Sequence, residues 1–177
     1  MRINFSIKYF THWGQNMAIS GSLPQLGENN PVKAVFMNFQ WKENWSYTID
    51  VDAQEPFEFS YRYLLKDSNG LDNFEWGTDR IIKVDPKTQQ EIFLVDTWNN
   101  PGAIENVFMT SPFQEVLFKD NYIPVKTPNK VKYTHVLRVK APLIKKGEGI
   151  CVIGNVKALG KWDTSKAVLL NNQDGPW

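Results

Sequence analysis

Apolar and polar positions alternate over most of the first hundred residues of the chain. Residues 3–9 place Ile, Phe, Ile and Tyr at every second position, a period typical of a strand with one buried face. The same period, or a short apolar run of strand length, recurs in the segments 17–20, 45–51, 57–63, 74–76, 80–84 and 91–96. Turn residues separate them, such as the run Asp67-Ser68-Asn69-Gly70, which favours a hairpin. About seven short strands joined by turns predict an all-β, antiparallel β-sandwich with an immunoglobulin-like architecture.

Residues 97–130 interrupt this rhythm. Prolines recur through the segment, and its apolar residues form two short clusters at 107–109 and 116–118. Proline ends regular strands and helices, whereas the apolar clusters make a free tether improbable. We therefore interpret 97–130 as an ordered linker that packs partly against its neighbour.

The strand pattern returns after residue 131 and repeats the beginning of the chain. Residues 14–21 match 147–154, and 26–27 match 159–160 at the same offset of 133 positions. The strand at 2–9 recurs at 133–140 with its alternation shifted by one residue. Repetition on this scale indicates two copies of one domain. We expect a first sandwich at 1–96 and the N-terminal half of a second, truncated one at 131–177, and we therefore expect the chain to be a fragment of a longer protein.

Composition and charge exclude several classes of protein. Hydrophobic residues make up 42% of the chain and charged residues 22%, as in soluble globular proteins. A formal charge of +1 leaves no surplus for nucleic acid or an anionic membrane. One cysteine and two histidines predict neither an intrachain disulfide nor a metal site. No apolar run of about 18 residues and no secretory-signal pattern is present, which makes a cytoplasmic location the default.

Candidate catalytic residues are few. Asp72, Glu75 and Asp79 cluster near Trp76, but acids in a turn normally stay solvated. Cys151 lies between two apolar residues of an expected strand, where a buried structural thiol fits better than a nucleophile. No glycine-rich phosphate loop follows a strand and opens a helix. We therefore predict no catalytic residue and no cofactor in these 177 residues.

Tryptophans provide the stronger signal, since the chain has seven of them. Trp13 and Trp41 stand in polar loops, Trp45 opens a strand, and Trp76 has charged residues on both sides. Exposed aromatic planes beside Asn, Gln, Lys and Glu suit sugars, because the C–H face of a pyranose stacks on the ring and its hydroxyls bond the polar neighbours. Packing into the core is the alternative for each tryptophan.

Several motifs, in order, resemble a known family. They are Gly21-Ser22, Leu26-Gly27, Asn44-Trp45, Phe57-Glu58-Phe59-Ser60-Tyr61-Arg62-Tyr63, Phe74-Glu75-Trp76-Gly77 and Asp79-Arg80. Over residues 2–96 they are similar to the starch-binding module of carbohydrate-binding family 20. With the segments 9–14 and 112–118 and the tandem arrangement, the chain resembles the N-terminal region of the disproportionating-enzyme type of 4-α-glucanotransferase, in glycoside hydrolase family 77. In that family two such modules precede the catalytic barrel.

The resemblance implies two glucan sites in the first copy. Trp76 matches one stacking tryptophan of site 1, Arg62 falls where the family has a lysine, and Asn29 replaces the other tryptophan. Site 2 is matched by three aromatic residues, Trp13, Trp41 and Trp45.

The second copy carries two further candidates. Trp162 stands at the position that Asn29 takes in the first copy, and Trp177 falls where the first copy reaches Trp45. The resemblance thus predicts glucan contacts at both.

The resemblance implies binding of α-glucan polysaccharide or malto-oligosaccharide by a non-catalytic region. The transferase chemistry, acting on α-1,4-glucans, would reside in a catalytic domain of the same chain that these residues do not contain. Three alternatives remain open: the same module on another starch-active enzyme, a protein-interaction sandwich packing on the missing barrel, and tryptophans that only fill cores.

Overall fold

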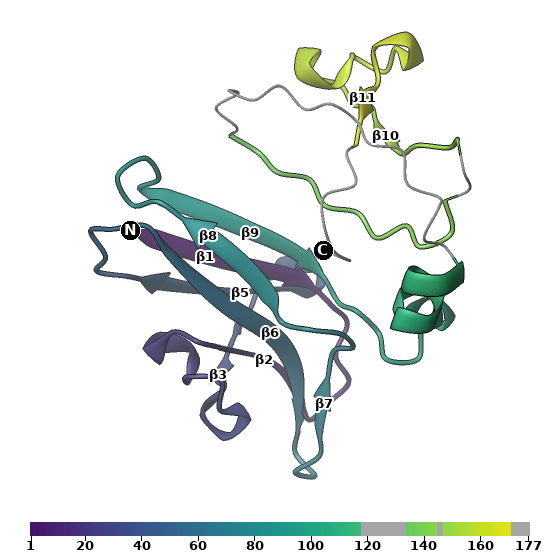
Figure 1. Ribbon diagram of the computed structural model, residues 1–177. Coiled ribbons are helices and arrows are strands. Elements are labelled where there is room, and N and C mark those ends of the chain that lie inside the picture. Colours follow the sequence, from purple (N-terminus) through teal and green to yellow (C-terminus); the bar gives the residue numbers. More distant parts are fainter. Residues whose placement is uncertain (118–133, 145–146, 171–177) are drawn as a thin grey trace. The chain divides into compact units, whose positions relative to one another are not determined.

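The computed structural model describes residues 1–117, 134–144 and 147–170. The chain divides into two compact units, Met1–Ala103 (unit 1) and Ile104–Trp177 (unit 2), which Figure 1 colours from purple to teal and from green to yellow.

Unit 1 is built almost entirely from strands. They are β1 (Arg2–Lys8), β2 (Gln15–Gly21), β3 (Val35–Phe36), β4 (Asn38–Phe39), β5 (Asn44–Asp50), β6 (Phe57–Asp67), β7 (Asp72–Phe74), β8 (Arg80–Val84) and β9 (Glu91–Thr97). Single 3-10 turns interrupt the long connections: η1 (Pro24–Leu26), η2 (Pro31–Lys33) and η3 (Trp41–Glu43).

These strands form two sheets (Figure 1). One has the order β4-β5-β1-β9, and the other has the order β3-β2-β6-β7, with β8 also pairing with β6. The long β6 serves two short partners in succession, because β7 pairs with its C-terminal half and β8 with its N-terminal half. All pairs in unit 1 are antiparallel except β1 with β9, the first and last strands, which run in parallel.

The core lies between the two sheets and follows from the alternation in the sequence. Every second residue of β1 points inward, and Ile3, Phe5 and Ile7 are fully or almost fully buried. From the facing sheet, Tyr61 packs edge-on against Phe5 with ring centroids 5.0 Å apart. Phe59 does the same at 6.3 Å. Aromatic edge-to-face contacts of this kind add to the burial energy of the rings.

The expected all-β sandwich is confirmed, and the strands lie where the alternation predicts them. One boundary differs in a way that matters for the site. The strand expected at 74–76 ends at Phe74, so Glu75 and Trp76 leave the sheet.

Unit 2 begins with two short helical segments, η4 (Ile104–Met109) and η5 (Pro112–Leu117). Phe108 and Phe113 join them through an edge-to-face contact at 5.3 Å. The apolar residues at 107–109 and 116–117 therefore lie in these helical segments. Residues 118–133, the remainder of the expected linker and its junction, lie outside the described residues.

The later part of unit 2 contains β10 (Cys151–Val152), η6 (Lys157–Leu159), η7 (Thr164–Lys166) and β11 (Val168–Leu169). Two expectations fail here. Residues 134–140 form no strand, since no strand in the described part of unit 2 flanks them as β5 and β9 flank β1. Cys151 is exposed and not buried, because β10 pairs only with β11 among the described residues.

Candidate functional site

Two exposed tryptophans come from neighbouring loops of unit 1. Trp13 lies between β1 and β2 and is fully exposed, and Trp41 opens η3 with 83% of its surface exposed. The bases of these loops are joined, because the Tyr9 amide donates a hydrogen bond to the carbonyl oxygen of Glu43 at 2.9 Å. Both tryptophans are therefore free to contact a ligand, as their polar sequence surroundings predict.

Trp45 differs from the expectation of an exposed platform. Only 5% of its surface is exposed, and its indole Nε1 donates to the Tyr9 carbonyl oxygen at 3.1 Å. The ring of Phe39 packs edge-on against it, with centroids 5.2 Å apart. Trp45 thus fixes the loop that leads to Trp13 and supports Phe39, while Phe39 faces solvent.

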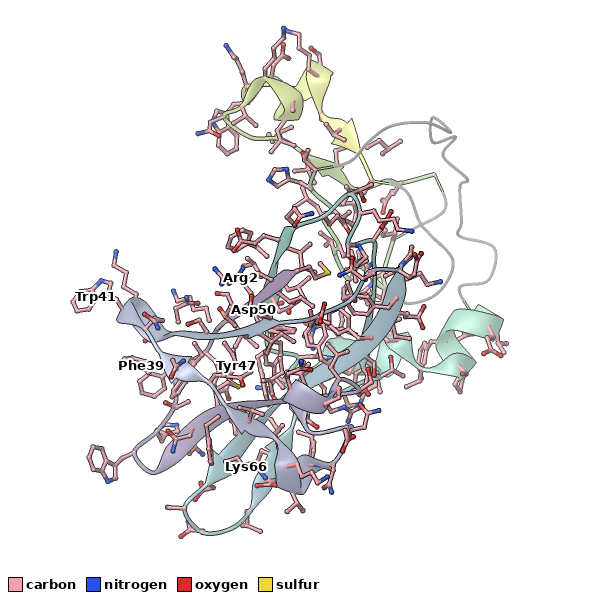
Figure 2. All side chains as sticks on the ribbon, turned by 90° about the vertical axis from the view of Figure 1, so that its left-hand side faces the viewer. Arg2, Phe39, Trp41, Tyr47, Asp50 and Lys66 are labelled. Carbon is pink, nitrogen blue, oxygen red and sulfur yellow. The ribbon has the colours of Figure 1, made fainter. Side chains whose placement is uncertain are left out.

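Phe39 is a residue that the sequence reasoning missed. It is 61% exposed, and Figure 2 shows its ring and that of Trp41 projecting from the same side of the molecule. The signal was available, because Phe39 stands between Asn38 and Gln40, in the same polar context that marked Trp41. Exposed aromatic rings on β4 and on these two joined loops therefore include Phe10, Trp13, Phe39 and Trp41.

Trp76 lies in the loop that connects β7 and β8 alongside β6. β7 ends at Phe74 and β8 begins at Arg80, and both pair with β6, so residues 75–79 form an excursion between two ladders. Trp76 is half-buried in it. Its amide donates to the Asn99 carbonyl oxygen at 2.9 Å, and the Asn99 side-chain amide donates back to the Trp76 carbonyl oxygen at 2.5 Å.

Arg62 reaches this loop from β6. Its Nη2 donates to the carbonyl oxygen of Gly77 at 3.3 Å, and its Nε forms an ion pair with Asp79. The guanidinium therefore braces the Trp76 loop, a role that its position in the sequence did not reveal.

Asn29 lies on the neighbouring strand connection. Its amide donates to the Gly21 carbonyl oxygen at 2.7 Å, next to Ser20, which pairs across the sheet with Arg62. Arg62 thus contacts the Trp76 loop through its side chain, and Asn29 is bonded to β2, the strand that pairs with the Arg62 segment of β6.

Acidic residues near Trp76 are engaged in ion pairs and are not merely solvated. Asp72 pairs with Lys66 at 2.6 Å, and Asp79 pairs with Arg62. Glu75 is only 5% exposed and accepts two bonds from the Arg80 guanidinium. Carboxylates held in this way give no acid and base pair for catalysis.

A buried network continues from Arg80. The hydroxyls of Tyr61 and Tyr63 both donate to Asp96 Oδ2, at 2.8 and 2.9 Å, and Arg80 Nε lies 3.4 Å from Asp96 Oδ1. Burial, and then the Asp96 charge, raise the pKa of both tyrosines well above the ordinary value. Each buried polar group has a partner, so the network is structural.

Trp162 stands at the position equivalent to Asn29, in a loop of unit 2 whose backbone turn hydrogen bonds repeat those of the unit 1 loop. Its amide donates to the Gly154 carbonyl oxygen at 2.9 Å, as that of Asn29 does to Gly21. The 3-10 turns η1 and η6 both end at a left-handed glycine, Gly27 and Gly160, with φ of 82° and 75°. The sequence repeat is therefore a structural repeat, and it leaves Trp162 65% exposed.

Left-handed backbone marks these loops. The non-glycine residues with positive φ in the described part of the chain are Glu28, Asn29, Lys42, Glu43, Lys161 and Trp162. This conformation costs an L-residue about 1–2 kcal/mol, and asparagine tolerates it best. A tryptophan held there at a φ of 65° is a strained residue of the kind found at functional sites.

The other predicted features can be stated briefly. Trp177 lies outside the described residues. Within the ranges that the structure describes, no three His, Cys, Asp or Glu side chains gather as metal ligands. No helix in the same ranges is long and apolar enough to cross a membrane.

Comparison with known proteins gives matches over both units. The profile of the starch binding domain family (CBM 20) matches residues 1–93 and 132–177. The 4-alpha-glucanotransferase DPE2 of Oryza sativa subsp. japonica is 25% identical over 181 residues, covering 94% of this chain and 19% of that protein. An alpha-amylase of Streptomyces violaceus is 29% identical over 97 residues, covering 55% of this chain and 16% of that protein.

Among solved structures, the family 20 module of the maltotetraose-forming amylase from Pseudomonas saccharophila STB07 is 16% identical, with a TM-score of 0.43, covering 54% of this chain and all of that one. The chain spans less than a fifth of the length of either of the two enzymes above.

Proposed function

This chain belongs to the starch binding domain family, and from that premise we propose which of its residues hold the glucan and in what kind of protein they do so. Binding of starch-type α-glucan is the function of the family and of this chain. The observation that carries the assignment of residues is the exposure of Trp13, Trp41 and Trp162 on loops and turns and of Phe39 on the short strand β4. None of these rings fills the core.

The main glucan site of unit 1 is the aromatic group formed by Trp13, Phe39 and Trp41. Stacking one sugar on one ring buries roughly 60 Å² of apolar surface, worth about 1.5 kcal/mol at ~25 cal/mol per Å². Two or three rings supply roughly 3–5 kcal/mol, close to the ~4 kcal/mol of a millimolar complex. Trp45 contributes by holding Phe39 and Tyr9 in place.

A second, weaker site of unit 1 is centred on Trp76. Its indole offers a single platform, because the equivalent of the other tryptophan is Asn29. Arg62 is engaged by Asp79 and Gly77, so it orients the loop and contributes less to the sugar hydroxyls.

Trp162 provides the platform of unit 2. It is exposed and sits in a loop whose hydrogen bonds repeat those around Asn29. A left-handed backbone at a bulky residue lowers the free energy of unfolding. A contact between Trp162 and the ligand would explain why the residue is a tryptophan despite this cost. Trp177 stays a prediction for the same unit.

The domain assignment follows the repeat. Residues 1–96 form one module, 97–130 a linker, and 131–177 correspond to the N-terminal half of a second module. The matched loops 21–35 and 154–168, which share their turns and caps, support this division.

The whole protein, on this proposal, is a 4-α-glucanotransferase whose catalytic domain is a partner in the same chain. The similarity to the rice enzyme over 94% of these residues supports it. The alternative is another starch-active enzyme, because the Streptomyces alpha-amylase is also similar to this chain, over 97 residues. A cytoplasmic location also stays a prediction from the sequence.

The site assignment is tested by titrating the full 177-residue chain with β-cyclodextrin while following tryptophan fluorescence. Trp13→Ala and Trp41→Ala each weaken binding to unit 1, and Trp162→Ala removes the contribution of unit 2. Phe93→Ala is the matched control, because Phe93 is an equally exposed ring on the outer face of β9. Equal loss in all four variants, or in none, contradicts the assignment.

A further inference from the structure

Asn99 holds the backbone of Trp76 from both sides. The Trp76 amide donates to the Asn99 carbonyl oxygen at 2.9 Å, and Asn99 Nδ2 donates to the Trp76 carbonyl oxygen at 2.5 Å. These two bonds fix the peptide groups that flank the Trp76 α-carbon. The direction of its Cα–Cβ bond, from which the indole extends, is fixed with them.

Asn99 is itself held in relation to the Trp76 loop. Arg80 Nη2 donates to Glu75 Oε2 at 2.9 Å and to the Thr97 carbonyl oxygen at 3.1 Å. One guanidinium therefore connects the residue before Trp76 with the last residue of β9, two positions before Asn99. The distance that Asn99 must span is set by this buried connection.

The loop needs such a clamp because it has no strand partner. β7 stops pairing at Phe74, and β8 resumes at Arg80. The Glu75 amide still donates to the Tyr63 carbonyl oxygen of β6 at 3.4 Å, and residues 76–79 lie outside the ladder of either strand. Gly77, next to Trp76, has a φ of 102°, a conformation that favours glycine. A substitution of Asn99 leaves the backbone bond from the Trp76 amide in place, but it removes the side-chain donor of the Trp76 carbonyl oxygen.

We propose that Asn99 is the positioning residue of the Trp76 platform, a role that rests on the glucan site proposed for Trp76. A platform that is already oriented loses less conformational freedom when the sugar stacks on it. Asn99 reaches Trp76 only through the backbone, and it acts on affinity through the orientation of the indole.

The test uses the full 177-residue chain with Trp13→Ala, Phe39→Ala, Trp41→Ala and Trp162→Ala, so that the remaining affinity for β-cyclodextrin depends on Trp76. Adding Trp76→Ala gives the baseline. Adding Asn99→Asp keeps the size of the side chain but replaces the donor with a second acceptor. We expect the Trp76-dependent affinity to fall about five- to tenfold, as for the loss of one buried hydrogen bond.

Asn100→Asp is the matched control, with the same change one residue later. Asn100 Oδ1 accepts a bond from the Gly102 amide at 2.8 Å, and aspartate retains that acceptor. We expect this variant to keep the Trp76-dependent affinity within about twofold.

Selectivity between sites separates positioning from folding. In a chain with Trp76→Ala but intact Trp13, Trp41 and Trp162, Asn99→Asp should leave affinity unchanged. If it weakens this binding as much as the Trp76-dependent binding, the role of Asn99 is only structural and the proposal is wrong. Asn99→Ala, which adds no charge, repeats the comparison should the aspartate variant fold poorly.

Two negative results are distinguishable. If Trp76→Ala lowers the affinity but Asn99→Asp does not, the positioning role fails while the glucan site stands. If Trp76→Ala changes nothing, the proposed site at Trp76 fails and its positioning residue with it.

Discussion

Asn29 and Trp162 take the same left-handed backbone in equivalent loops, with φ of 60° and 65°, and differ in the side chain they present. Asparagine adopts this conformation readily, whereas a bulky residue does not. The two positions therefore allow a reciprocal exchange within one molecule.

A tryptophan at either position should raise the affinity for glucan and lower the unfolding free energy, and an asparagine should do the reverse. Asn29→Trp adds a second platform beside Trp76 and should strengthen β-cyclodextrin binding at that site by about tenfold, the equivalent of roughly 1.4 kcal/mol. It should cost unit 1 about 1 kcal/mol of unfolding free energy because of the left-handed φ. Trp162→Asn should abolish the contribution of unit 2. Calorimetric titration and urea unfolding measure both effects, and an Asn29→Trp variant with unchanged affinity contradicts the proposed site.

Tyr61 and Tyr63 should make the protein sensitive to alkali. Because burial and Asp96 raise the pKa of both hydroxyls, the folded protein keeps these protons above about pH 10, where an unfolded chain releases them. Stability is therefore fully present below that pH and falls as pH rises, by about 1.4 kcal/mol per pH unit for each tyrosine.

Tyr63→Phe removes one of these groups and should reduce that slope by about 1.4 kcal/mol per pH unit. Urea unfolding at a series of alkaline pH values measures it. Tyr47→Phe is the control, since Tyr47 is only partly buried. Identical slopes in wild type and Tyr63→Phe would show that the network does not hold the protons.

Exposure of single residues was predictable only in part. The polar neighbours of Trp13 and Trp41 correctly indicated exposed rings. The polar neighbours of Trp45 did not indicate that its ring is buried. Its Nε1 donates a hydrogen bond to the Tyr9 carbonyl oxygen, and this contact joins residues 36 positions apart.

Strands were predictable because apolar and polar residues alternate along each of them, and this local alternation determines which side chains are buried. The Trp76 loop was not, since it is held by contacts between elements. Glu75 forms an ion pair with Arg80, and Asp79 forms one with Arg62. The side chain of Asn99 donates a hydrogen bond to the Trp76 carbonyl oxygen. The acids that looked like solvated turn residues hold the excursion between β7 and β8.

Breaking the Glu75–Arg80 pair should therefore destabilise unit 1. Arg80→Met leaves the Glu75 carboxylate buried without its guanidinium and should cost about 3–5 kcal/mol of unfolding free energy. Lys83→Met, on the same strand, breaks an exposed pair with Glu58 and should cost less than about 1 kcal/mol. Urea unfolding compares the two, and similar small losses in both contradict a structural role for the pair.

On the scale of the whole molecule, the repeat places the proposed glucan platforms in two units. Weak sites gain from being joined, because on one long polymer the second contact becomes intramolecular. The tandem pattern at an offset of 133 residues was readable from the sequence, and the turns, caps and left-handed residues of both loops follow it. The irregular backbone of residues 134–140 was not predictable from their alternating pattern, because a strand forms only beside a hydrogen-bonded partner strand.

Joining the units should make polymer binding more sensitive than oligosaccharide binding to the loss of one platform. Trp162→Ala should reduce retention on granular starch by about tenfold or more, while the affinity of the unit 1 sites for β-cyclodextrin stays unchanged. Sedimentation of starch with bound protein measures the first, and calorimetric titration the second. Equal effects on both ligands would show that the units act independently.

Discrimination between glucan linkages is the sharpest test of whether these tryptophans bind α-glucan. The measurement is calorimetric titration of the intact chain with maltopentaose and with cellopentaose, which have equal length and composition. We expect saturable binding of maltopentaose in the range of about 1 mM, lost in the Trp13→Ala/Trp41→Ala/Trp76→Ala/Trp162→Ala variant, and no saturation with cellopentaose. Equal affinity for both sugars, or no binding of maltopentaose, would contradict the account.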